Sequence, residues 1–273
     1  MVFIWPFFLV VLLAGALGCS VGFKKFIWFM SVGYGLAISL IGAAMLVMSI
    51  IYKQISIPYL LLCAVVIIYG LRLGLFLLVR ELKNADYRKT LASAGGEKKM
   101  PAPVLVSMWL MNTCLYYMET AGLHYRLANT VQYGTAIDQG NVCLWIGLVI
   151  AALGVIIEAV SDAQKSAQKK ENPNMVATKG LFKMCRCPNY FGEILVWTGI
   201  LVSALPVLHA GQWVIAILGY VCIVYIMFNG AKRLETRQTK RCWKMQEYRD
   251  YANKTPIIIP FLPIYHLINW IQD

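Results

Sequence analysis

Long apolar runs alternate with short polar segments along the whole chain, a pattern typical of membrane-spanning helices. Most of these runs are close to or above the roughly 20 residues that a helix needs to cross a bilayer. We therefore predict an all-α membrane protein, a single polytopic bundle of about seven transmembrane helices. The predicted spans are 2–22, 26–51, 57–79, 103–125, 141–160, 190–208 and 212–228. The apolar segment 256–263 is short and interrupted by prolines, so we expect it to be re-entrant or interfacial.

The distribution of Lys and Arg predicts how the bundle is oriented. Almost all of the 25 basic residues follow the first, third, fifth or seventh predicted span. Lys53 and Arg126 lie on the opposite side, and Arg72 lies within the third span. By the positive-inside rule, the N-terminus then faces outward and the C-terminal tail is cytoplasmic. The net charge of +12 would lie on the cytoplasmic face, where it attracts anionic lipids or a phosphorylated ligand but no nucleic acid.

The composition excludes an ordinary soluble domain. The chain is 59% hydrophobic and 14% charged, whereas soluble domains have about 45–50% apolar and about 25% charged residues. Most of the 8 cysteines lie in apolar runs and are expected to be buried. The three His residues are scattered, so we expect no metal site. No Gly-x-Gly-x-x-Gly sequence follows a strand, which argues against a soluble dinucleotide-binding domain.

Four polar residues lie where the fifth and sixth spans approach the cytoplasm. Glu158 and Asp162 are one helical turn apart, as are Asn189 and Glu193. The sixth helix is expected to begin near Pro188, where free backbone N–H groups can bind an anionic or polar ligand. Carboxylates within a membrane are costly and usually functional. The alternative is that the glutamates pair with a basic residue and only stabilise the bundle.

Five motifs in the second half carry a resemblance to a known family. The chain resembles the membrane steroid 5-alpha-reductase superfamily over about residues 145–263, and is most similar to its bacterial-type branch, a domain of unknown function. The motifs are Gly180-Leu181-Phe182, Arg186-Cys187-Pro188-Asn189-Tyr190-Phe191-Gly192-Glu193, Leu234-Glu235-Thr236-Arg237, Tyr248-Arg249-Asp250-Tyr251 and Ile259-Pro260. The family usually has His where Cys187 stands, so this chain departs from the family pattern at that position.

The resemblance implies NADPH-dependent reduction of a C=C bond conjugated to a carbonyl, in a steroid-like or other apolar lipid. It implies an integral protein of the bacterial cytoplasmic membrane, with membrane lipids around it and a substrate that enters from the bilayer. Residues 1–140 would form the substrate side, and 141–273 would bind the cofactor from the cytoplasmic side. The expected cofactor contacts are Arg72, Glu158, Asp162, Lys170, Arg186, Asn189, Tyr190, Glu193, Arg233, Glu235, Arg237, Tyr248 and Tyr251.

The spacing of the basic tail supports a phosphate-binding role independently of the resemblance. Arg233, Arg237, Lys240 and Lys244 fall on one helical stripe, and guanidinium groups match phosphate oxygens well. A solvated basic helix that lies on anionic lipid explains the same stripe. Both interpretations remain open from the sequence.

The first half matches the family only weakly. The reductases carry a tyrosine that is followed three residues later by an arginine, and Tyr69 and Arg72 have the same spacing. The resemblance implies that this tyrosine donates a hydrogen bond to the substrate carbonyl. Arg72 could equally snorkel to the interface. The glutamate that studied reductases carry in the second span is absent, since 26–51 has no acidic residue. Glu119 in the fourth span could replace it, or could lie near the outer surface with Arg126.

Two other classes of function compete with the reductase. Isoprenylcysteine carboxyl methyltransferases share an Arg-His-Pro-x-Tyr-x-Gly sequence and bind S-adenosylmethionine. The Asn189 and Glu193 positions, together with Asp162, favour the reductase over this alternative. A non-catalytic seven-helix receptor or transporter would leave the basic tail motifs without a role.

Overall fold

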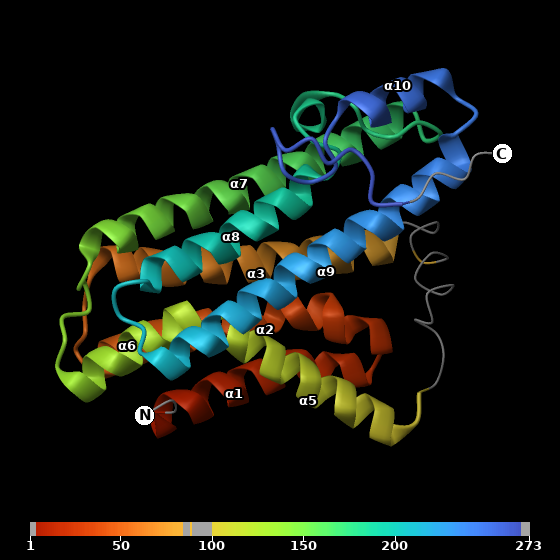
Figure 1. The fold of residues 1–273 in the computed structure, drawn as a ribbon. Helices are drawn as coiled ribbons and strands as arrows, with labels where there is room; N and C mark the ends of the chain where they lie inside the picture. Colours follow the sequence, from red (N-terminus) through yellow and green to blue (C-terminus); the bar gives the residue numbers. More distant parts are fainter. Residues whose placement is uncertain (1–3, 84–87, 89–99, 269–273) are drawn as a thin grey trace. The chain divides into compact units, whose positions relative to one another are not determined.

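The computed structural model describes residues 4–83, 88 and 100–268, and every regular element in that part of the chain is helical (Figure 1). The all-α prediction is therefore confirmed. In the described part of the first half, the helices are α1 (Trp5–Cys19), α2 (Val32–Ile51), α3 (Ile57–Lys83) and α5 (Ala102–Glu119). They are followed by α6 (Ala121–Tyr133), α7 (Asn141–Glu171), α8 (Pro188–Ala204), α9 (Ala210–Cys242) and α10 (Gln246–Lys254). Short 3-10 helices cover η1 (Ser20–Phe23), η2 (Phe26–Met30) and η4 (Gly180–Lys183).

Five helical segments of the described chain are long and apolar enough to cross a membrane. They are Trp5–Phe23, Val32–Ile51, Ile57–Lys83, Asn141–Glu171 and Ala210–Cys242. These segments coincide with the first, second, third, fifth and seventh predicted spans. The sixth predicted span forms α8, which has 17 residues. The count of seven spans and the outward N-terminus remain predictions.

The fourth predicted span is divided into two helices at Thr120. The Thr120 hydroxyl donates to the Tyr116 carbonyl at 2.8 Å, one turn earlier in α5. A threonine hydroxyl that bonds back to this carbonyl bends a helix. The apolar run 103–125 thus contains the junction between α5 and α6 and does not form one continuous helix.

The chain divides into two compact units, and unit 1 comprises residues 1–149 and 199–220. Within unit 1, α2 and α3 approach each other backbone to backbone at Gly35. A Cβ atom at this glycine would lie 2.5 Å from the Gly70 carbonyl oxygen and 2.6 Å from the Gly74 nitrogen. Only glycine permits this separation, because any side chain would overlap the facing helix.

Arg126 is a fully buried charge of unit 1 that organises the chain around it. Its Nη1 donates to the carbonyls of Ile137 (2.7 Å) and Gln139 (2.9 Å), and its Nε donates to that of Ser203 (3.1 Å). These carbonyls lie in the segment after α6 and in the last turn of α8, where no helical N–H group is available to bond them. The Arg126 guanidinium supplies the donors that they need. Arg126 therefore has a structural role, with its side chain buried within unit 1.

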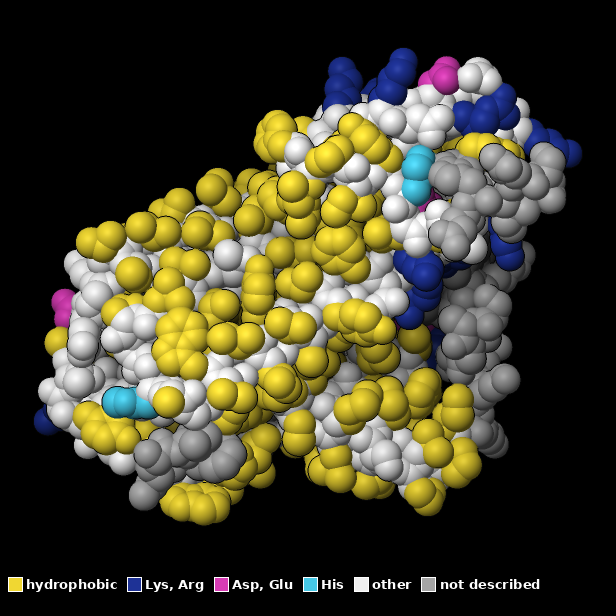
Figure 2. All heavy atoms as spheres, in the orientation of Figure 1, with side chains coloured by type: hydrophobic (Ala, Val, Ile, Leu, Met, Phe, Trp, Pro, Cys, Tyr) yellow, Lys and Arg dark blue, Asp and Glu magenta, His cyan; other side chains and the backbone are white. Residues whose placement is uncertain are grey.

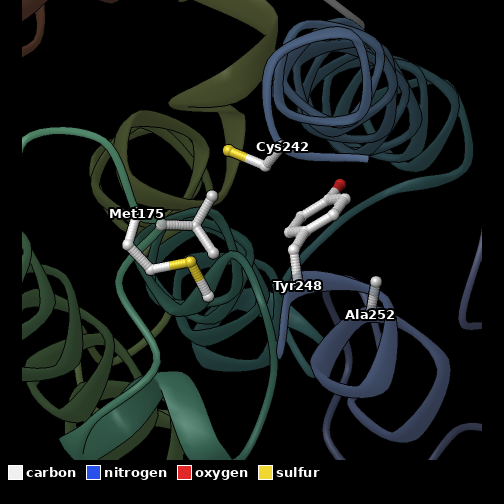
Figure 3. Close-up of a cluster of buried hydrophobic side chains, with 5 residues drawn as sticks. Met175, Cys242, Tyr248 and Ala252 are labelled. Atoms are coloured by element: carbon white, nitrogen blue, oxygen red, sulfur yellow. The ribbon is translucent and has the colours of Figure 1, made fainter. Parts of the chain in front are cut away.

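Unit 2 comprises residues 150–198 and 221–273. A small apolar core within it packs α10 against the rest of the unit. The core contains Met175, Val176, Cys242, Tyr248 and Ala252 (Figure 3). Figure 3 shows the Tyr248 ring between the end of α9 and the segment that holds Met175. The Tyr248 side chain thus fixes the helix that follows the long basic α9.

Candidate functional site

The predicted cofactor site lies where α7 and α8 touch within unit 2. A Cβ atom at Gly192 would lie 2.7 Å from the Gly154 carbonyl oxygen and 2.8 Å from the Glu158 nitrogen. The two helices therefore meet backbone to backbone. Because Glu193 follows Gly192 directly and Asn189 precedes it by three residues, this contact brings the polar residues of α8 next to Glu158.

Three carboxylates and one carboxamide come from the two helices that meet at this contact. Glu158 is 3% exposed, and Asp162 and Glu193 are each 7% exposed. The Asn189 side chain is half-buried, but its carboxamide oxygen is inaccessible to solvent. Within the described part of the chain, this oxygen has no hydrogen-bond partner. A buried acceptor without a donor costs about 1–3 kcal/mol, so Asn189 is suited to receive an N–H group from a bound molecule.

Tyr190 lies between this site and the basic helix α9. A Cβ atom at Gly230 would lie 3.3 Å from the Tyr190 ring, so the turn of α9 that leads to Arg233 packs against this ring. Arg233 and Arg237 are exposed, as are Lys240 and Lys244 of the same predicted stripe. Figure 2 shows Lys and Arg side chains gathered at the end of unit 2 that carries α10. Arg233, Arg237 and Lys240 thus form a solvent-accessible cationic face on α9, whereas Lys244 lies beyond the last residue of this helix, Cys242.

Two residues predicted to contact a cofactor, Arg186 and Glu235, are bonded to each other. Arg186 and Glu235 form an ion pair of 2.7 Å in which both side chains are almost fully buried. Glu235 also accepts from His266 Nδ1 at 2.9 Å and from the Leu267 backbone nitrogen at 2.8 Å. Arg186 donates further to the Tyr265 carbonyl. This network binds the segment after α10, so a role of either residue as a cofactor ligand remains a prediction.

The other residues of the tail motif have partners within unit 2. The Tyr251 hydroxyl donates to the Phe182 carbonyl at 2.7 Å, and the Tyr248 hydroxyl lies 3.0 Å from that of Thr239. These contacts link α10 to η4 and to α9. Lys170 is exposed near the end of α7. The structure brings Lys170, Tyr248 and Tyr251 to the same unit as Asn189 without showing a ligand role for them.

The two cysteines next to Arg186 are poor candidates for reactive groups. Burial raises the pKa of the Cys187 thiol to about 11 and that of Cys185 to about 12. A thiol must lose its proton to act as a nucleophile or metal ligand. Within the described residues, no group of three or more His, Cys, Asp or Glu side chains is arranged to hold a metal ion.

The predicted catalytic residues lie in unit 1. Tyr69 is fully buried in α3, and the half-buried Arg72 follows one turn later. Glu119 is 6% exposed and forms the last residue of α5. The hydroxyl found beside that of Tyr69, at 3.2 Å, belongs to Tyr34 of α2.

The family of the chain is decided by a match that covers most of its length. A family model described as "Protein of unknown function (DUF1295)" matches residues 22–255. The chain belongs to this family. The matched part includes Glu158, Asp162, Asn189 and Glu193. It also contains both helices of the α7–α8 contact.

Curated relatives of this DUF1295 protein confirm the resemblance to steroid reductases at low identity. Steroid 5-alpha-reductase DET2 of Gossypium hirsutum is 25% identical over 119 residues, which is 42% of this chain and 41% of the relative. The 3-oxo-5-alpha-steroid 4-dehydrogenase 1 of Mus musculus is 26% identical over 122 residues, 44% of this chain and 43% of the relative. An uncharacterized protein of Schizosaccharomyces pombe, C7D4.09c, is 40% identical over 78 residues, 28% of this chain and 26% of the relative. The matches thus span less than half of these relatives, and no solved structure matches the chain significantly.

Sequence reasoning missed the contacts of two polar residues of this DUF1295 protein, Tyr34 and Arg126. Tyr34 lies in an apolar run, so its type and position alone do not distinguish it from a core residue. The Tyr-Gly pair that occurs at both Tyr34 and Tyr69 was a signal that could have indicated it. The three-carbonyl site of Arg126 had no signal in the sequence, because the carbonyls come from residues 137, 139 and 203.

Proposed function

We propose that this DUF1295 protein is an NADPH-dependent membrane reductase of a C=C bond conjugated to a carbonyl, acting on a steroid-like or other apolar lipid. The buried Asn189 oxygen without a donor is the observation that supports the cofactor half most directly. A carboxamide offers an N–H donor for this oxygen and a carbonyl acceptor, and nicotinamide carries such a group. The names of the relatives support the reductase class, and they motivate the choice of a steroid-like substrate.

The residues of unit 2 divide into two roles in this proposal. Asn189 and Glu193 hold the carboxamide by hydrogen bonds at the start of α8. Arg233 and Arg237, on the exposed cationic face of α9, bind phosphate oxygens. Bound NADPH would supply the hydride, and the basic face of α9 would bind the charge of its additional phosphate. A cytoplasmic location of this face follows from the predicted orientation.

The polarising residue in this proposal is Tyr69 of unit 1. Addition of a hydride at the β-carbon would develop negative charge on the carbonyl oxygen of the substrate. The Tyr69 hydroxyl donates a hydrogen bond to this oxygen, and a proton from water completes the α-carbon. One hydride and one proton are consumed, and the C=C bond becomes saturated. A donor aimed at a developing oxyanion contributes about 10²–10³ in rate.

Identification of the nucleotide that copurifies with the protein tests the proposal. The protein would be purified in mild detergent without added nucleotide, and the released small molecules identified by mass spectrometry. We expect NADPH or NADP⁺. S-adenosylmethionine or S-adenosylhomocysteine would support the methyltransferase alternative and would contradict the reductase.

A further inference from the structure

The irregular segment that follows α10 forms a closed loop in unit 2, drawn in dark blue in Figure 1. The Arg186 backbone nitrogen donates to the Pro256 carbonyl at 2.8 Å, and the Arg186 guanidinium donates to the Tyr265 carbonyl. Between these two contacts, the Ile257 nitrogen donates to the Ile264 carbonyl at 2.8 Å. Both ends of the loop are therefore fixed beside Arg186, just before α8 begins.

Glu235 sets the level of this loop along the axis of α9. Its carboxylate lies 2.9 Å from His266 Nδ1 and accepts from the Leu267 nitrogen at 2.8 Å. Along α9, the exposed side chains change from hydrophobic, such as Tyr225 at 69% exposure, to basic from Lys232 onward. A helix rises about 1.5 Å per residue, so Glu235 lies about 5 Å beyond Lys232. The ends of the loop are thus close to the level at which the apolar surface of α9 ends.

The turn of the loop presents apolar side chains to its surroundings. Phe261 is 91% exposed, Leu262 45% and Ile264 39%. Ile257 and Ile258 at the start of the loop are each 1% exposed, so this part packs inside unit 2 and the turn does not. Phe261 has a φ of 69°, in the left-handed region that residues other than glycine rarely adopt. The backbone therefore holds a strained turn whose aromatic side chain is directed outward.

The turn is long enough to span the distance to the apolar surface of unit 2. Three residues on each side separate the bonded pair Ile257 and Ile264 from the middle of the turn. An extended residue spans about 3.3 Å, so the turn reaches about 10 Å from this pair. This reach exceeds the distance of about 5 Å along α9 between Glu235 and Lys232.

The surroundings of the turn favour lipid over a protein partner. The helix that positions the loop, α9, is long and apolar enough to cross a membrane. Lys and Arg side chains gather at the end of unit 2 that carries α10 (Figure 2), and Lys254, directly before the loop, is exposed. An apolar turn beside exposed basic residues suits a membrane interface, because the apolar side chains enter the acyl region while the cations attract anionic headgroups.

We propose that residues 261–264 dock into the bilayer that surrounds this chain, with the Phe261 ring among the acyl chains next to the headgroups. The driving force is the removal of apolar surface from water. Of the segment 256–263, only the turn meets lipid, since Ile257 and Ile258 pack inside unit 2. Docking ties the loop, and with it the start of α8, to the membrane surface. This role is independent of the proposed reaction.

Photocrosslinking in a bilayer tests this docking. Phe261 is replaced by the photoreactive p-benzoylphenylalanine in the full chain, which is reconstituted in nanodiscs of phosphatidylethanolamine and phosphatidylglycerol. After irradiation, peptide mass spectrometry identifies phospholipid adducts. We expect adducts at position 261 at least about tenfold more often than at Glu247, an exposed residue of α10, because burial in an apolar medium is favourable for an aromatic ring. The same replacement of Tyr225 is the positive control, since this residue is exposed on the apolar part of α9.

A turn that docks elsewhere gives different products. Crosslinks between two chains would identify an interface between copies of the protein, and crosslinks within one chain would show that the turn packs on the protein itself. Either of these as the main product would overturn the proposal. A phospholipid yield at position 261 as low as that at Glu247, with adducts at Tyr225, would overturn it as well.

Cysteine labelling provides a second measurement without the bulky probe. Leu262→Cys and Glu247→Cys are compared in the same nanodiscs with a charged, membrane-impermeant maleimide, followed by mass spectrometry of each peptide. Lipid around residue 262 should slow its labelling at least about tenfold, because apolar surroundings suppress the reactive thiolate. Equal labelling rates would refute the docking. Neither measurement needs nucleotide or substrate, so a failure of the docking is distinguishable from a failure of the proposed function.

Discussion

Replacement of Glu235 by Gln should destabilise the protein strongly while preserving the shape of the side chain. The carboxylate accepts from Arg186 at 2.7 Å, His266 at 2.9 Å and the Leu267 nitrogen at 2.8 Å. An amide removes the charge and directs N–H groups toward some of these donors. The buried Arg186 guanidinium is then left without its counter-charge.

The expected size of this loss follows from the burial of the pair. Side-chain exposure is 2% for Arg186 and 1% for Glu235, so water cannot replace the missing partner. Removing one member of such a pair costs about 3–5 kcal/mol. For a chain of this length, the melting temperature should fall by on the order of 10 °C.

Thermal unfolding in detergent provides the measurement. A thiol-reactive fluorophore reports unfolding as buried cysteines, Cys242 among them, become accessible. Glu247→Gln is the control, because Glu247 is an exposed residue in the first turn of α10. Equal melting temperatures for the two variants, with loss of NADPH binding in Glu235→Gln only, would refute the structural role and favour direct contact with the cofactor.

Two further predictions concern helix packing and thiol chemistry. Gly70→Ala should destabilise the protein by about 1–3 kcal/mol, because its Cβ would lie 2.4 Å from a backbone oxygen. Gly74→Ala should be tolerated, since its nearest neighbour would lie at 3.4 Å; equal melting temperatures would contradict the α2–α3 contact. Burial raises the pKa of the Cys187 thiol to about 11, so a fraction of about 10⁻³ of this thiol should be thiolate at pH 8. Peptide mass spectrometry should therefore show no modification of Cys187 by iodoacetamide within minutes. Rapid labelling would contradict its burial.

Much of the helical fold could be predicted from the sequence, because apolar runs of sufficient length have few other structures in a membrane. Helix ends in the polar segments were less predictable. The last predicted span, 212–228, continues in α9 to Cys242. The exposed basic residues of that extension lie on a helical stripe, which a search for apolar runs does not detect. The division at Thr120 depends on one side-chain bond to the backbone.

The candidate site was predictable only in part, for reasons of chemistry. The sequence spacing predicted that Asn189 and Glu193 lie on one helix. Only the structure shows the contact between Gly154 and Gly192, which brings the backbone of Glu158 next to that helix. A charged residue in a motif does not reveal its partner, so Arg186 and Glu235 could each be assigned to a ligand although they bond to each other. Tyr34 escaped because a tyrosine in an apolar run resembles any other core residue.

Equilibrium binding of NADPH to the purified protein, followed by the fluorescence of the reduced nicotinamide, tests the central claim most directly. We expect saturable binding that is tighter for NADPH than for NADH, because the cationic face of α9 binds the additional phosphate. We also expect that Asn189→Ala weakens NADPH binding at least about tenfold while the melting temperature without nucleotide is retained. Equal affinity for both nucleotides, no binding, or unchanged affinity in a folded Asn189→Ala variant would contradict the account.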